Sequence, residues 1–239
     1  MLRRGQGTRS IFRTVAGGTL VALALSGAAL FTPQVHAAGQ TLLAAKLADL
    51  RGETASADVR HIADWAVASG DAAGLPFAIV DKVDSRVFVF DAEGRLRGAT
   101  PALVGAARGD TSVPGIGSRK ISSIQPQERT TPAGRFRAIM GRGPRGEDIL
   151  WVDYDSALAL HRVVTNVPEE RRLQRLQSRV AAERRITYGC INVPAAFFEN
   201  VVVPAFAGSR GVVYILPEAK PATAVFGSYQ VRHEVGQAH

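Results

Sequence analysis

Short runs of β-branched and aromatic residues dominate the chain beyond residue 75. Residues 77–81 and 86–91 form two such runs joined by a short polar stretch, which is typical of a β-hairpin. The same composition recurs in residues 96–104, 135–140, 149–154, 158–163 and 212–216, with clusters of Gly and Pro between the runs. This succession of strands predicts a mainly β fold with a few helices.

Apolar residues recur at helical spacing in two other parts of the chain. Residues 41–69 contain two such stretches separated by Gly52, which predicts two short helices. A third helix is predicted from Pro168 to about Arg185, because acidic residues follow Pro168 and the apolar residues behind them share one face. Its other face is rich in arginine. That face is either a solvated surface or a guide for an anionic substrate.

Two stretches have neither pattern. Residues 105–132 are polar and rich in Gly, Ser and Pro, and we expect a structured or functional loop there. Residues 218–239 are mostly polar and are predicted to form a loosely ordered C-terminal tail.

The first 37 residues have the pattern of a signal peptide. Four arginines precede residue 15, residues 15–31 are apolar, and Val35-His36-Ala37 follows them as a small-residue cleavage site. We expect cleavage after Ala37 and export across the bacterial cytoplasmic membrane, to the periplasm or cell envelope. The alternative is an uncleaved anchor, since the apolar stretch is near the shortest length that spans a bilayer. Residues 38–74, which follow the predicted signal peptide, are expected to form a helical N-terminal segment.

Composition and charge exclude several classes of partner. The chain has 29 basic and 21 acidic residues, and four arginines of the predicted signal peptide account for half of its net charge of +8. The remaining excess is spread along the chain, so no nucleic acid is expected as a partner. Two Gly-x-Gly sequences, at 115–117 and 141–143, lack the strand–helix context of a phosphate-binding loop, so no nucleotide is expected either. No spacing of Cys and His indicates a metal site, and we expect no cofactor.

The residues that suggest chemistry are His161, at the end of a predicted strand, and the sequence Thr187-Tyr188-Gly189-Cys190-Ile191-Asn192. A cysteine is nucleophilic as a thiolate, and a histidine within hydrogen-bond distance can take its proton. Backbone N–H groups at Tyr188, Gly189 and Cys190 would then face an oxyanion. The alternative is an inert buried cysteine and an ordinary core histidine. The residue types alone leave both interpretations open.

The sequence Thr-Tyr-Gly-Cys-Ile-Asn resembles the nucleophile motif of the YkuD-type L,D-transpeptidases. A second motif of that family resembles Thr131-Pro132-Ala133-Gly134-Arg135-Phe136. The resemblance covers residues 75–217 and implies an L,D-transpeptidase-type β-sandwich, a catalytic domain that attacks peptidoglycan stem peptides with a cysteine.

By position, the resemblance implies Cys190 as the nucleophile and His161 as its base, with the main-chain carbonyl of Arg162 orienting the imidazole ring. Thr187 and Asn192 match polar positions of the motif, which would order the loop and contact the substrate. Their alternative role is that of ordinary turn residues. Two features depart from the family pattern: Tyr188 stands where most members have His, and the segment between His161 and Thr187 is longer. We expect the arginine-rich helix in that segment to gate the cleft.

The implied activity is that of an exported cysteine L,D-transpeptidase, which acts on peptidoglycan tetrapeptide stems by two-step acyl transfer. The acceptor is left open between a second stem, a lysine of a cell-wall protein, a free D-amino acid and water. An L,D-carboxypeptidase is therefore one alternative, and a catalytically weak wall-binding or scaffold protein is another.

Three further sets of residues are weaker site candidates. Asp153 and Asp155 could form a carboxylate pair. His61 and His233 lie outside the region that matches the family.

Overall fold

The computed structural model describes residues 46–231. The predicted signal peptide, residues 41–45 of the first predicted helix, and His233 lie outside the described residues. Within residues 46–231, no helix is both long enough and apolar enough to cross a membrane.

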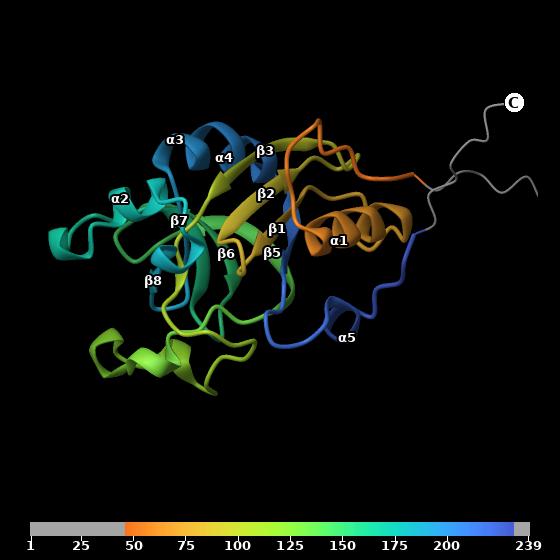
Figure 1. Cartoon of the computed structure of the whole chain (residues 1–239). Coiled ribbons are helices and arrows are strands. Elements are labelled where there is room, and N and C mark those ends of the chain that lie inside the picture. The colour runs from red at the N-terminus through yellow and green to blue at the C-terminus, as the bar shows by residue number, and fades with distance from the viewer. Residues whose placement is uncertain (1–45, 232–239) are drawn as a thin grey trace, which may run out of the picture. The chain divides into compact units, whose positions relative to one another are not determined.

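Eight strands form one mixed sheet (Figure 1). Its strand order is β3-β2-β1-β10-β5-β6-β7-β9, and neighbouring strands are antiparallel except for the parallel pairs β1–β10 and β7–β9. The strands are β1 (Phe77–Asp81), β2 (Arg86–Phe90), β3 (Leu96–Pro101), β5 (Gly134–Arg142), β6 (Asp148–Asp153), β7 (Leu158–Arg162), β9 (Ile191–Val193) and β10 (Arg210–Ile215). A second, two-stranded sheet pairs β4 (Val104–Gly105) with β8 (Arg185–Thr187).

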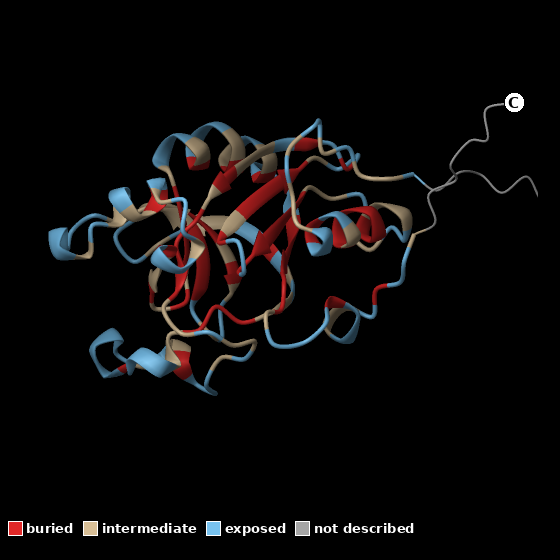
Figure 2. Ribbon diagram, viewed as in Figure 1, coloured by how far each residue is buried: buried red, intermediate tan, exposed pale blue. Residues whose placement is uncertain are grey.

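Alternation of side chains along the strands supplies two separate hydrophobic cores. Ala78 and Val80 of β1 face the first core, and Phe77 and Ile79 of the same strand face the second. The first core also gathers side chains from β2, at one end of the sheet, and from β7 and β9, at the other end. The sheet therefore bends over this core in the manner of a sandwich. Strands β1, β2 and β10 are buried along almost their whole length (Figure 2).

Helices cover both cores. The second core is closed by α1 (Ala57–Ala68), whose N-terminal amides are capped by the hydroxyl of Ser56. The first core is closed by a continuous helical segment made of α3 (Ala195–Phe197), a π-helical turn (Phe198–Val202) and α4 (Val203–Phe206). Its side chains at Phe198, Val202 and Phe206 recur every fourth residue and are fully buried.

The sequence analysis is confirmed for the mainly β architecture and for the 77–91 hairpin, and is wrong about several helices. Of the two helices predicted within residues 41–69, the described part of the first is not helical, because Asp49 pairs with Arg95 as an extended bridge. Residues 105–132 contain three turns of 3-10 helix: Ile116–Ser118, Ile121–Ser123 and Pro126–Glu128. The prediction of a loosely ordered tail is wrong for residues 218–231, because Glu218 is buried and α5 (Ala222–Phe226) packs against the second core.

The single helix predicted from Pro168 to Arg185 is also wrong. The structure has a 3-10 turn (Pro168–Glu170), a short helix α2 (Arg172–Gln177) and a second 3-10 turn (Ala181–Arg184). The backbone reverses at Arg171, which has φ +47°, and becomes extended at Ser178. Arginine side chains stabilise these breaks by donating to main-chain carbonyls: Arg175 to those of Glu170 and Glu183, and Arg184 to that of Asp84.

Candidate active site

The parallel pair β7–β9 places three polar side chains on one face of the sheet. His161 lies opposite Asn192 in the register of this pair, and Cys190 precedes β9 by one residue. Leu160, Ile191 and Val193 point into the first core. Because side chains alternate along a strand, His161, Asn192 and Cys190 all point away from that core.

His161 is held at both ring nitrogens. Its Nδ1 lies 2.7 Å from the carbonyl oxygen of Arg162, which is the contact that the family resemblance implies, and its Nε2 lies 3.2 Å from Nδ2 of Asn192. Burial lowers the pKa of His161 below its ordinary value of 6.5. The Arg162 carbonyl opposes this shift, whereas the positive charge of Arg172 adds to it. The imidazole is therefore neutral at neutral pH and has the protonation state of a base.

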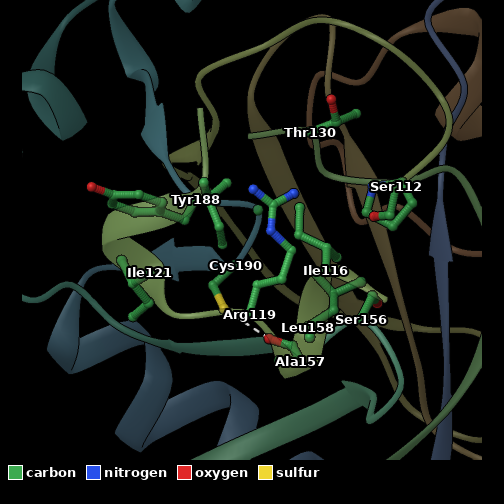
Figure 3. A pocket seen from close by; sticks show the side chains of 14 residues that line it. Ser112, Ile116, Arg119, Ile121, Thr130, Ser156, Ala157, Leu158, Tyr188 and Cys190 are labelled. Atoms are coloured by element: carbon green, nitrogen blue, oxygen red, sulfur yellow. Dashed lines mark hydrogen bonds between the residues drawn. The ribbon is translucent and has the colours of Figure 1, made fainter. Parts of the chain in front are cut away.

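Cys190 is a free, half-buried thiol. Its Sγ lies 3.5 Å from the carbonyl oxygen of Ala157 (Figure 3). Burial raises the pKa of the Cys190 thiol above its ordinary value, while the backbone amide of Ala159 and the charge of Arg172 act in the opposite direction. Burial thus favours the neutral form of both the thiol and the imidazole.

Hydroxyl groups on two threonines fix the loop that carries Cys190. The hydroxyl of Thr187 donates to the carbonyl of Cys190 at 2.7 Å and accepts from the amide of Gly189 at 3.2 Å. Gly189 has φ +136°, and a Cβ at this position would lie 3.1 Å from the carbonyl oxygen of Thr130. The loop therefore requires glycine here.

Thr131 ties the second motif to the nucleophile loop. Its buried hydroxyl donates to the carbonyl of Gly189 at 2.7 Å and accepts from the amide of Gly105 at 2.8 Å. The carbonyl of Thr131 in turn accepts from Nζ of Lys82 at 3.0 Å. The two motifs found in the sequence are thus parts of one hydrogen-bonded unit.

Lys82 lies at the centre of a buried ionic network behind this unit. Its ammonium group is 1% exposed and lies 2.9 Å from a carboxylate oxygen of Asp110 and 3.9 Å from one of Glu218. Glu218 also forms an ion pair with Arg185, at the start of the strand that leads to the nucleophile loop. Arg185 donates further hydrogen bonds to the carbonyls of Gly105 and of Lys82. The segment after Pro217 is therefore part of the support of the site.

The Cys190 sulfur borders a cavity of about 240 Å³. Tyr188 and Gly189 line it beside the cysteine, and the 3-10 turns of residues 116–124 contribute Ile116, Ile121 and Arg119 (Figure 3). Arg119 is fixed by a two-point ion pair with Glu128. The Tyr188 ring lies 4.0 Å below the guanidinium of Arg129, in a cation–π contact.

His161 borders a different cavity, of about 410 Å³. Arg145 and Glu147 from the β5–β6 turn line this space together with Asp148, the first residue of β6, and Arg162. The charges of Glu147 and Arg145 act on the pKa of His161 in opposite directions. The thiol and the imidazole are thus approached from two separate cavities.

The structure brings the motif residues into contact and leaves the weaker candidates apart. Thr187, Gly189, Cys190, Asn192 and His161 are linked by the hydrogen bonds and strand pairing described above. The predicted carboxylate pair is not formed, because Asp153 accepts from the amide and hydroxyl of Ser156 within a turn. His61 bonds to the hydroxyl of Ser228 and lines neither cavity.

Sequence reasoning missed Arg172, whose guanidinium donates to Oδ1 of Asn192 at 2.9 Å. It also missed the burial of Lys82, which reads in the sequence as a hairpin-turn residue. Within the described part of the chain, no group of three or more His, Cys, Asp and Glu side chains is arranged to hold a metal ion.

Together, the fold and the site define a mostly β protein in which a histidine on β7 and a cysteine just before the neighbouring parallel strand β9 each border a cavity. No family model matches the chain, and no curated protein matches it.

Among solved structures, the chain is similar to the catalytic domain of an L,D-transpeptidase from E. faecium, at 14% identity and a TM-score of 0.34, over 59% of this chain and 95% of that domain. It is similar to the helical cell shape determining protein Pgp2 from Campylobacter jejuni, at 15% identity and a TM-score of 0.40, over 62% of this chain and 49% of that one. It is also similar to an L,D-transpeptidase from Mycobacterium smegmatis, at 15% identity and a TM-score of 0.34, over 59% and 58% of the two chains. The chain thus spans about half the length of the Campylobacter protein.

Proposed function

We propose that the protein is an exported cysteine L,D-transpeptidase that acts on peptidoglycan tetrapeptide stems in the periplasm or cell envelope. The observation that carries this proposal is the site itself: a cysteine on a glycine-dependent loop borders a cavity, and a neutral histidine lies on the same outward face of the neighbouring strand. The two motifs quoted above support the substrate class. Residues 1–37 are proposed to be the cleaved signal peptide and residues 75–217 the catalytic domain.

In the first step, the Cys190 sulfur attacks the carbonyl that links an L-centre to the terminal D-residue. The thiol proton passes to Nε2 of His161, and a carbon–sulfur bond forms while the carbonyl oxygen becomes an oxyanion. Collapse of this intermediate breaks the carbon–nitrogen bond, and the imidazolium returns its proton to the leaving amine. Because burial raises the pKa of the Cys190 thiol, His161 is needed to take its proton.

Backbone amides of the nucleophile loop stabilise the oxyanion. The Gly189 amide donates to the Thr187 hydroxyl in the resting structure, so the amides of Tyr188 and Cys190 are the stronger candidates. The Thr187 hydroxyl also holds the Cys190 carbonyl, so Thr187 keeps the loop in shape for the reaction.

In the second step, an acceptor attacks the thioester carbonyl while His161 takes the proton of the attacking group. Collapse of the intermediate breaks the carbon–sulfur bond, and the imidazolium returns the proton to the Cys190 sulfur. An amine of a second stem gives a cross-link, a lysine of a cell-wall protein gives an attached protein, and water gives an L,D-carboxypeptidase. A catalytically weak scaffold is the alternative from another class. The raised pKa of Cys190 is the observation that favours it, because a binding protein does not need an ionisable thiol.

The test is incubation of the mature protein with a disaccharide tetrapeptide, with and without an added amine acceptor, followed by mass spectrometry of the products. Release of the terminal D-amino acid together with an amine-linked product supports transpeptidation, and release without that product reassigns the enzyme as a carboxypeptidase. The matched control is Cys190→Ala. Release by this variant at the wild-type rate, or no release by either protein, would contradict the proposal.

A further inference from the structure

Arg172 contacts Asn192, which is the hydrogen-bond partner of His161, although it comes from the segment between His161 and Thr187. Its Nη1 donates to Oδ1 of Asn192 at 2.9 Å, and its Nε donates to Oε2 of Glu170 at 2.5 Å. The side chain is 12% exposed, so the guanidinium is largely removed from water. This arginine is therefore fixed in direction from two sides.

The donors and acceptors of Arg172, Asn192 and His161 are compatible with only one orientation of the Asn192 amide and one tautomer of His161. A guanidinium has only donors, so it must face the oxygen of the Asn192 amide. The NH₂ group of that amide then faces Nε2 of His161 at 3.2 Å, and this nitrogen must present its lone pair. The proton of the neutral ring consequently lies on Nδ1, where the carbonyl of Arg162 accepts it at 2.7 Å. The tautomer is fixed from both ends of one chain of donors and acceptors.

We infer that Arg172 is a positioning residue that sets the tautomer of His161 through Asn192 and so keeps a lone pair on Nε2. This inference rests on the proposed role of His161 as the base, because a lone pair on Nε2 is what a base requires. Asn192 must release Nε2 when the thiol proton arrives. Arg172 holds the amide oxygen, so the NH₂ group returns to Nε2 after each turnover.

The charges around His161 and Cys190 also favour a neutral His161. Arg172 acts on both members, lowering the pKa of His161 and that of Cys190. From the β5–β6 turn, Glu147 raises the pKa of His161 and Arg145 lowers it. A protonated His161 would set an N–H against the NH₂ of Asn192, so the arrangement also disfavours the imidazolium at rest.

The experiment uses ¹⁵N-histidine-labelled protein and long-range ¹H–¹⁵N spectra near pH 8, which distinguish the two neutral tautomers. The His161 resonance is assigned with His161→Gln. The wild-type ring should be in the Nδ1–H form, and Arg172→Met should give a mixture of both tautomers with a higher His161 pKa. Arg172→Lys should restore a single donor-only contact and return most of the population to Nδ1–H.

A second readout is the rate of Cys190 alkylation by iodoacetamide at pH 7.5. Loss of the Arg172 charge raises the pKa of the thiol, and we expect a fall of about three- to tenfold in Arg172→Met. The matched control is Arg179→Met, which removes an exposed arginine from the same segment and should leave both readouts unchanged.

Asn192→Asp tests the inference should Arg172→Met fail to fold. A carboxylate oxygen would face Nε2 in place of the NH₂ group, so Nε2 should also gain a proton while the Arg162 carbonyl keeps the one on Nδ1, and the His161 pKa should rise. A folded Arg172→Met with a pure Nδ1–H ring and wild-type alkylation would overturn the inference, as would an Asn192→Asp ring that stays in the Nδ1–H form with an unchanged pKa. Neither readout needs a substrate, so absence of transpeptidation would refute the proposed function while leaving these outcomes decisive for Arg172.

Discussion

The Thr131 hydroxyl offers a quantitative test of how the nucleophile loop is held. Thr131→Val replaces this hydroxyl by a methyl group of similar size, at a side chain that is 1% exposed. Two buried main-chain groups, the carbonyl of Gly189 and the amide of Gly105, then lose their partner. Each unsatisfied buried group costs about 1–3 kcal/mol, so we expect the free energy of unfolding to fall by about 2–4 kcal/mol after local relaxation.

The assay is equilibrium unfolding in urea at neutral pH. With a slope near 2 kcal/mol per molar urea, this loss lowers the midpoint by about 1–2 M without changing the slope. Thr131→Ser retains the hydroxyl and should recover most of the loss. The matched control is Thr100→Val, at a buried threonine of β3 whose hydroxyl has no hydrogen-bond partner among the described residues. A Thr131→Val midpoint within about 0.3 M of wild type (about 0.6 kcal/mol), or an equal loss in Thr100→Val, would refute the reasoning.

Three further predictions concern pH, catalysis and processing. Because burial holds the pKa of folded His161 below 6.5, the contribution of this residue to stability should be fully present above that pH and be lost as the pH falls toward the folded-state pKa. His161→Gln should therefore reduce the change in the urea midpoint between pH 7 and 5, and an equal change in wild type and variant would contradict this. His161→Ala should slow D-amino acid release by about 10²–10⁴-fold. The double variant His161→Ala/Cys190→Ala should be little slower than Cys190→Ala alone, and a double variant slowed by the product of the two single effects would show that the residues act independently. Envelope-derived protein should begin at Ala38 by N-terminal mass analysis; a sequence starting at Met1 would indicate an anchor.

The strands were predictable because their signal is local and strong. In β1 and β2 nearly every residue is buried, because the two faces of these strands contact two different cores, so the sequence there is a continuous apolar run. The motif around Cys190 was visible in the sequence because its glycine and threonine perform specific backbone tasks in the loop. Local sequence was sufficient wherever local geometry decided the structure.

The failures have long-range causes. Lys82 reads as a polar turn residue, yet Asp110 and Glu218, which neutralise it, come from distant parts of the chain. The broken helix at 168–184 has regular apolar spacing, but its arginines satisfy main-chain carbonyls better in the interrupted form. Nothing in the sequence distinguishes Arg172 from its arginine neighbours, because its role depends on the position of Asn192 across the fold.

The central claim, that Cys190 forms a covalent acyl-enzyme with a stem peptide, is tested most directly by intact-protein mass spectrometry. The mature protein is mixed with a tetrapeptide stem, quenched in acid at short times, and weighed beside Cys190→Ala. The account predicts an adduct equal to the stem minus its terminal D-amino acid, located on the peptide that contains Cys190, and absent from Cys190→Ala. An adduct of the same mass on Cys190→Ala, or release of the D-amino acid by an attack that never modifies Cys190, would contradict it.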